Sequence, residues 1–176
     1  MFNKILQINF FLLFCFTISL AEVIKSVEVS GNKRFSKESI IVFGKINLDA
    51  DYDDKKLNEV IKKLYSTNFF KQINLDLKNN ILLIKVNENP IIEDLEINGI
   101  KNSKMLDHIE NAMKLKSRKS YVESVFLKDV TYVKNVLYQS GYYFSDVKTS
   151  LIRNEERNSI RLIYDIDTGK KAKISE

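Results

Sequence analysis

Cysteine is almost absent from this chain: Cys15 is the only one in 176 residues. It lies in an apolar segment near the N-terminus, and removal of that segment would leave no cysteine. Disulfides, a thiolate nucleophile and cysteine-ligated zinc are then excluded from the remaining chain. Proline and glycine are also scarce, with one and five residues, so we expect no long flexible linker.

Histidine is equally rare, because His108 is the only one. Its neighbour Asp107 would not face it on a helix, so the spacing supports no catalytic triad. The acidic run 49–54 resembles a calcium loop, but it has Asp54 where the loop requires glycine and Val60 where it requires glutamate. We interpret the run as negative charge preceding a helix. The sequence therefore predicts no enzyme, with no catalytic residues, cofactor or metal.

The net charge of +5 arises from 28 basic and 23 acidic residues that are interleaved along the chain. This pattern is typical of a solvated surface, and we expect no nucleic-acid partner. The basic cluster 114–119 is interpreted as a solvated loop. Contact with acidic partners or lipid headgroups is the alternative.

Residues 1–21 have the three parts of a secretory signal. A short basic start, MFNK, precedes an apolar run of 11 residues from Phe10 to Leu20. Small residues at Ser19 and Ala21 predict cleavage between Ala21 and Glu22. A spanning helix needs about 20 apolar residues, more than this run contains. An uncleaved membrane anchor and lipidation of Cys15 are therefore the weaker alternatives. An exported chain without cysteine fits a bacterial envelope protein best.

The remaining chain repeats itself. Val27, Val29 and Gly31 match Leu95, Ile97 and Gly99 at an offset of 68. The segment LYSTNFFKQINLDL, which contains Tyr65 and Asn68, returns as LYQSGYYFSDVKTSL, which contains Tyr138 and Gly141, at an offset of 73. Repetition at this length indicates two copies of one structural unit.

Each copy predicts a strand, two helices and a hairpin. The strands 23–29 and 92–97 end at a turn glycine, and Ser36 and Ser103 are expected to cap the helices 36–43 and 103–113. The second helices carry apolar stripes and stop at Asn68 and Gly141, residues that tolerate a left-handed backbone. The aromatic pairs 69–70 and 142–143 are expected to pack in the two cores, with peptide contact as a secondary role.

The hairpins complete the unit. Their first strands alternate apolar and polar residues, turn at 79–80 or 154–158, and continue into strands starting at Ile81 and Ile160. We predict an α+β fold with two tandem β-α-α-β-β units. In each, the last strand lies centrally in a three-stranded mixed sheet, and both helices cover one face.

This order resembles the POTRA (polypeptide-transport-associated) domain family. The matching features are Gly31 and Gly99, the helix ends at 64–70 and 137–143, and the closing hairpins. A tandem pair behind a signal segment resembles the N-terminus of outer-membrane protein assembly factors. The predicted domains are 22–90 and 91–168. Residues 169–176 are interpreted as a linker and the start of a third unit, in a truncated record of a longer protein.

The resemblance implies a role at the periplasmic face of the outer membrane. Implied partners are unfolded outer-membrane proteins, accessory lipoproteins of the assembly machinery, and the outer membrane itself through a C-terminal barrel missing from this sequence. A two-partner secretion or related transporter and a membrane-anchored cell-division protein are the alternatives.

The candidate binding site consists of backbone groups, not side chains. If the last strand is central, then 71–78 and 144–152 are edge strands, whose unpaired N–H and C=O groups can accept another strand. Lys71, Asp76 and Lys78 could instead protect the first edge. The residues expected to bind peptide are Gln72, Ile73, Asn74, Leu75, Asp146, Val147, Lys148 and Thr149.

Overall fold

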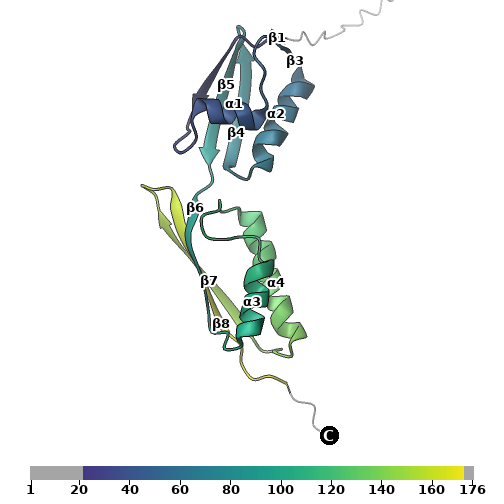
Figure 1. Ribbon diagram of the computed structural model, residues 1–176, viewed down its shortest axis with the longest axis vertical. Coiled ribbons are helices and arrows are strands. Elements are labelled where there is room, and N and C mark those ends of the chain that lie inside the picture. The colour runs from purple at the N-terminus through teal and green to yellow at the C-terminus, as the bar shows by residue number, and fades with distance from the viewer. Residues whose placement is uncertain (1–21, 173–176) are drawn as a thin grey trace, which may run out of the picture.

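The computed structural model describes residues 22–172, which form two α+β units arranged end to end along the molecule (Figure 1). The predicted signal segment, with Cys15 and Ala21, lies outside the described residues. So do residues 173–176 of the predicted third unit. No helix within 22–172 is long and apolar enough to cross a membrane.

The first unit is built on a sheet of order β2-β5-β4. β2 is parallel to the central β5, and β4 is antiparallel to it. The predicted single strand 23–29 is wrong in one respect. It breaks at Ile24 and Lys25, and its first residues pair with a second short strand that follows α1. The elements are β1 Glu22–Val23, β2 Ser26–Ser30, α1 Lys37–Gly44, β3 Asp51–Tyr52, α2 Asp54–Ser66, β4 Phe70–Lys78 and β5 Ile81–Glu88.

The second unit repeats this arrangement with the order β6-β8-β7. Its elements are β6 Ile91–Asn98, α3 Ser103–Ala112, α4 Glu123–Gln139, β7 Asp146–Asn154 and β8 Ser159–Asp167. Both helices lie on one side of the sheet (Figure 1). The predicted fold class is therefore confirmed, including the central position of the last strand in each mixed sheet.

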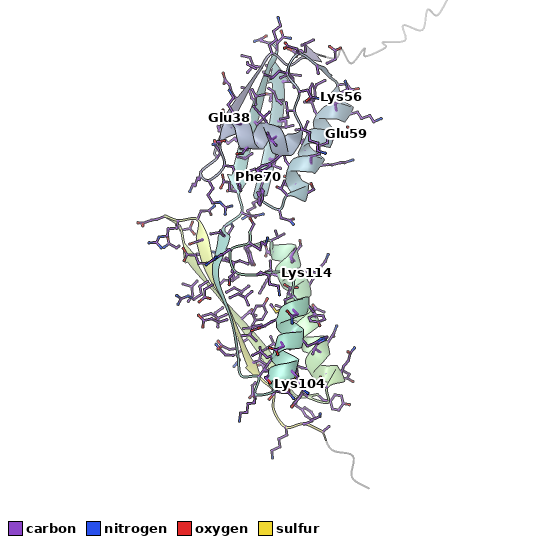
Figure 2. The ribbon with its side chains drawn as sticks, viewed as in Figure 1. Glu38, Lys56, Glu59, Phe70, Lys104 and Lys114 are labelled. Carbon is purple, nitrogen blue, oxygen red and sulfur yellow. The ribbon has the colours of Figure 1, made fainter. Side chains whose placement is uncertain are left out.

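The core of each unit lies between its helices and one face of its sheet. The central strands alternate buried and exposed residues, so the opposite face of each sheet is open to water. On the helix side, Leu64 and Leu137 are fully buried. On the outer side of α2, Lys56 and Glu59 are exposed, and Phe70 lies at the end of the first unit nearest the second (Figure 2).

The helix ends follow the sequence with one exception. Ser36 caps α1, as predicted, and Asn68 and Gly141 have φ of 61° and 88°. The second predicted cap is wrong, because Asn102 caps α3 and Ser103 is its first helical residue. The Asn102 side chain accepts the Met105 N–H at 3.0 Å, which satisfies the bond assigned to serine.

The aromatic pairs do not pack alike. Phe69 and Phe70 join the first core, and the Phe69 ring stacks on Phe35 at 4.6 Å. Tyr142 packs against the second core, but Tyr143 is 53% exposed, so core packing is wrong for Tyr143. The two pairs also lie at different distances from the strand that follows them. β4 begins at the second aromatic, whereas β7 begins three residues after Tyr143.

The acidic run 49–54 leads into the N-terminus of α2. Asp53 caps α2 and accepts the Lys56 N–H at 2.8 Å, and Asp54 lies in its first turn. Both positions favour negative charge near a helix N-terminus, which agrees with the interpretation from sequence.

Candidate functional site

The two strands predicted as edges, β4 and β7, are each an outer strand of their sheet. The opposite outer strands are β2 and β6. All eight candidate peptide-binding residues lie on the predicted edges: Gln72, Ile73, Asn74 and Leu75 on β4, and Asp146, Val147, Lys148 and Thr149 on β7. Whether these residues bind peptide stays a prediction.

Only every second residue of an outer strand directs its N–H and C=O away from the sheet. In β4, the two-residue turn 79–80 has positive φ at both asparagines and closes on the pair Lys78 and Ile81. The pair that closes such a turn is hydrogen-bonded, so the alternation can be counted back along the register. The outward backbone groups of β4 belong to Ile73, Leu75 and Leu77.

In β7, the outward residues are found in the same way, starting from the central strand β8. The Ile91 N–H donates to the Asn158 C=O at 3.0 Å, so Ser159 and alternate residues after it face β7. Asp146 and Lys148 are paired with residues of that set. The outward groups of β7 belong to Val147, Thr149, Leu151 and Arg153.

The register therefore divides the candidate residues into two sets. Ile73, Leu75, Val147 and Thr149 present backbone groups to an incoming strand, whereas the other four are bonded to the central strands. The ion pairs Asp76–Lys78 and Asp146–Lys148 belong to the inward-bonded set. Their side chains lie on the wet face, so they do not cover the outward backbone groups.

One outward group of β4 already has a partner. The N–H of Ile73 donates to the hydroxyl of Tyr65, at 3.2 Å. The equivalent tyrosine of the second unit is Tyr138, which packs edge-on against Tyr143 with ring centres 4.8 Å apart. Within residues 22–172, Tyr138 makes no hydrogen bond to β7. Sequence reasoning treated both tyrosines as equal landmarks and missed this difference.

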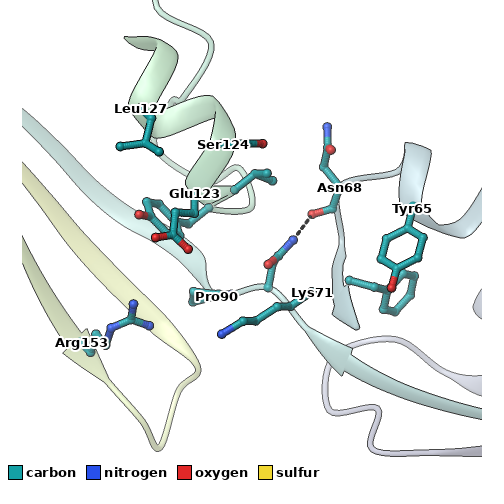
Figure 3. Close-up of a pocket in the computed structure, with 12 residues that line it drawn as sticks. Tyr65, Asn68, Lys71, Pro90, Glu123, Ser124, Leu127 and Arg153 are labelled. Carbon is teal, nitrogen blue, oxygen red and sulfur yellow. Dashed lines mark hydrogen bonds between the residues drawn. The ribbon is translucent and has the colours of Figure 1, made fainter. Parts of the chain in front are cut away.

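A groove of about 520 Å³ lies where the units meet (Figure 3). The first unit contributes Tyr65, Asn68, Phe70 and Lys71, and the joint contributes Asn89 and Pro90. The second unit contributes Tyr121, Val122, Glu123, Ser124, Leu127 and Arg153. The groove thus joins the start of β4 to the start of α4 and the end of β7, with aromatic, apolar and both kinds of charged side chain.

Side-chain and backbone hydrogen bonds hold the chain at this joint. The Asn89 side chain donates to the Asn68 C=O at 2.9 Å, and the Tyr121 N–H donates to the Pro90 C=O at 2.8 Å. The Asn158 side chain donates to the Glu88 C=O at 3.3 Å. The Asn89 bond lies within the first unit. The other two connect the end of that unit to two separate loops of the second.

Glu88 is a buried carboxylate at the same end of β5. It accepts the backbone N–H groups of Lys33, Arg34 and Phe35, and the Arg34 guanidinium lies 3.0 Å away. Burial opposes ionisation of Glu88, but these donors outweigh it and hold the pKa of the carboxyl below its ordinary value. Every second residue of β5 is buried, and Glu88 is the last of that series. This alternation could have identified Glu88 as a buried carboxylate from the sequence.

Asp129 has a corresponding role in the second unit. It is buried on α4 and accepts the N–H groups of Lys114, at 3.0 Å, and Leu115, at 2.8 Å. The backbone at the start of the basic cluster 114–119 is thereby fixed. His108 lies on the surface, where its Nε2 is 3.0 Å from the Tyr132 hydroxyl.

Known proteins resemble this chain in sequence and in fold. The POTRA family model, described as a surface antigen variable number repeat, matches residues 90–169. This match covers the second unit of the chain. The resemblance to the POTRA domains of assembly factors is confirmed by two relatives, each named outer membrane protein assembly factor BamA.

The relative from Neorickettsia risticii is 32% identical over 90 residues, which are 51% of this chain and 12% of that protein. The relative from Neisseria meningitidis serogroup B is 27% identical over 167 residues, which are 90% of this chain and 20% of that protein. This chain thus spans a fifth or less of these curated relatives. The N-terminal domain of Omp85 from Thermosynechococcus elongatus shares the fold, with a TM-score of 0.52 at 11% identity, over 84% of this chain and 63% of that one.

Proposed function

We propose that this chain is the periplasmic POTRA module of an outer-membrane β-barrel protein assembly factor. In this role it binds unfolded outer-membrane proteins and accessory lipoproteins by adding their strands to its sheets, and it catalyses no reaction. It is exported through cleavage after Ala21, its domains divide between residues 90 and 91, and a barrel beyond this sequence holds it at the outer membrane.

The observation that carries this proposal is the outward backbone of β4 and β7. Each strand ends its sheet and directs alternate N–H and C=O groups outward. An unfolded barrel protein is a chain of amphipathic strands that lack partners, so its backbone complements such an edge with little dependence on sequence. The names of the two relatives support the assembly context.

The test is binding of a purified outer-membrane barrel protein that is fluorescently labelled and unfolded in urea. After dilution beside increasing amounts of this chain, we expect its fluorescence anisotropy to rise and saturate. The matched control is the same barrel protein folded in detergent, whose strands are already paired, and it should not bind. Equal binding of both forms, or of neither, would contradict recognition of unpaired strands.

A further inference from the structure

The outer strands β4 and β7 occupy equivalent places, but their surroundings differ. Tyr65 occupies the first outward donor of β4, whereas Tyr138 leaves the corresponding donor of β7, at Val147, unoccupied among the described residues. The edge of the second unit is therefore open at the end where the edge of the first is closed.

An exposed stripe on α4 accompanies the open edge. Leu127, Thr131, Lys134 and Tyr138 are spaced at i, i+4, i+7 and i+11, which places them on one helix face, and all four are exposed. Leu127 is 58% exposed and Tyr138 is 61% exposed. At one end Leu127 shares the inter-unit groove with Arg153 of β7, and at the other Tyr138 contacts Tyr143, just before β7. The stripe thus runs along the full open edge.

The equivalent face of α2 differs at both ends: it begins with a carboxylate, and its tyrosine is bonded to β4. At the offset of 73 its equivalent positions are Asp54, Asn58, Ile61 and Tyr65. The far end of β4, at Leu75 and Leu77, borders a hollow that also contains Glu22, Asp53, Asp54 and Asp76. β4 is therefore closed by a hydroxyl at one end and flanked by carboxylates at the other.

We propose that β7, and not β4, is the edge that accepts a client strand in this chain, with an extended peptide of alternating apolar or aromatic side chains as its occupant. The inference rests on the proposed function. Val147 and Leu151 point toward the helix layer, so alternate side chains of a strand added beside them would point the same way. There they meet Tyr138 and Leu127. Tyr143, which contacts Tyr138, extends this apolar surface at the start of β7.

The occupied length of the edge follows from the register. Outward groups run from Val147 to Arg153, which sets a client segment of about seven residues, roughly 23 Å long. At Arg153 the segment reaches the groove between the units. Lys134 and Arg153 beside the path favour a client without excess positive charge.

The probe is a synthetic nine-residue peptide in which valine and tyrosine alternate with threonine, blocked at both ends. Amide hydrogen exchange of the ¹⁵N-labelled chain is measured by NMR with and without saturating peptide. We expect exchange at Val147, Thr149 and Leu151 to slow at least tenfold, and exchange at Leu75 and Leu77 to stay unchanged. Two variants target the edge and the stripe. Thr149→Pro removes one outward N–H but keeps the hydrogen bonds between β7 and β8. Leu127→Asp places on α4 the aspartate that the first unit has at the equivalent position, Asp54.

Each variant should weaken peptide binding at least fivefold, while Asp54→Asn, the matched change in the first unit, leaves binding unaltered. The unfolding midpoint of each variant reports whether it has folded. Protection at Leu75 and Leu77 without protection on β7 would overturn this inference and leave the proposed function standing. Peptide binding that protects neither strand overturns strand addition on β4 and β7, and with it the binding site of the proposed function. If neither the peptide nor the urea-unfolded barrel protein binds, the proposed function fails as well.

Discussion

The N–H of Ile73 donates to the hydroxyl of Tyr65 at 3.2 Å, a bond between the outer strand of the first unit and the helix beside it. It uses a backbone donor that an incoming strand would otherwise take. The two sheets of this chain thus present unequal edges although they share one topology.

Tyr65→Phe removes this hydroxyl without changing the ring. A hydrogen bond contributes about 1 kcal/mol net, so we expect the Ile73 amide to exchange about fivefold faster in native conditions. The matched control is Tyr138→Phe, which should leave the Val147 amide unchanged. NMR-detected exchange measures both. An unchanged Ile73 amide would show that Tyr65 does not close the edge.

Glu88→Gln should destabilise the first unit by about 1–3 kcal/mol, because the buried acceptor loses its charge and one of its accepting oxygens. Lys33, Arg34 and Phe35 would then share a weaker acceptor. Urea unfolding followed by circular dichroism gives the change. Glu28→Gln, at an exposed position on β2, is the control and should shift the midpoint little. Equal effects of the two changes would contradict the role assigned to Glu88.

The same carboxylate predicts a dependence on pH. The pKa of Glu88 is lower in the folded chain than its ordinary value of about 4.5, so folding favours the ionised form. The resulting stability is fully present above that ordinary value and is lost as the pH falls through the lower, folded pKa. The urea midpoint of the wild-type chain should therefore fall more steeply below about pH 4.5 than that of Glu88→Gln. Parallel curves would contradict this.

Gly99→Ala should be among the most damaging changes to a small residue. Gly99 has a φ of 90°, and an added Cβ would lie 1.8 Å from the Ile166 C=O oxygen. We expect a loss of about 3 kcal/mol or more. Gly141→Ala is the matched control, since its φ is 88° but the nearest contact of a Cβ is the Lys171 side chain at 3.5 Å. It should cost about 1–2 kcal/mol for the left-handed backbone alone. Similar losses would show that the close approach to Ile166 is relieved cheaply.

The repeat made most of the fold predictable. Two copies of the same pattern agree on which segments are helices, and the nearly continuous apolar strand at Ile81 indicates a central position. The helix stops at Asn68 and Gly141 are local backbone preferences, so they too can be read from sequence. The cap at Asn102 was missed because adjacent asparagine and serine are both good caps, and only the backbone chooses between them.

The candidate site was predictable only in part. An edge strand follows from topology, but which of its residues face outward depends on the pairing register, which Asn79–Asn80 fixes through the turn. The closure of β4 depends on a tyrosine hydroxyl that reaches a backbone eight residues away. Tyr138 occupies the matching position without doing so, and its ring packs on Tyr143 instead. The sequence match alone could not distinguish these two outcomes.

The central claim is that a client binds as an added strand on β7. Isotope-edited NMR on the complex of the ¹⁵N,¹³C-labelled chain with the unlabelled alternating peptide tests it most directly. The account predicts intermolecular backbone NOEs between the peptide and alternate residues of β7, centred on Thr149 and Leu151. NOEs confined to side chains on the wet face of the sheet, with none to the β7 backbone, would contradict it.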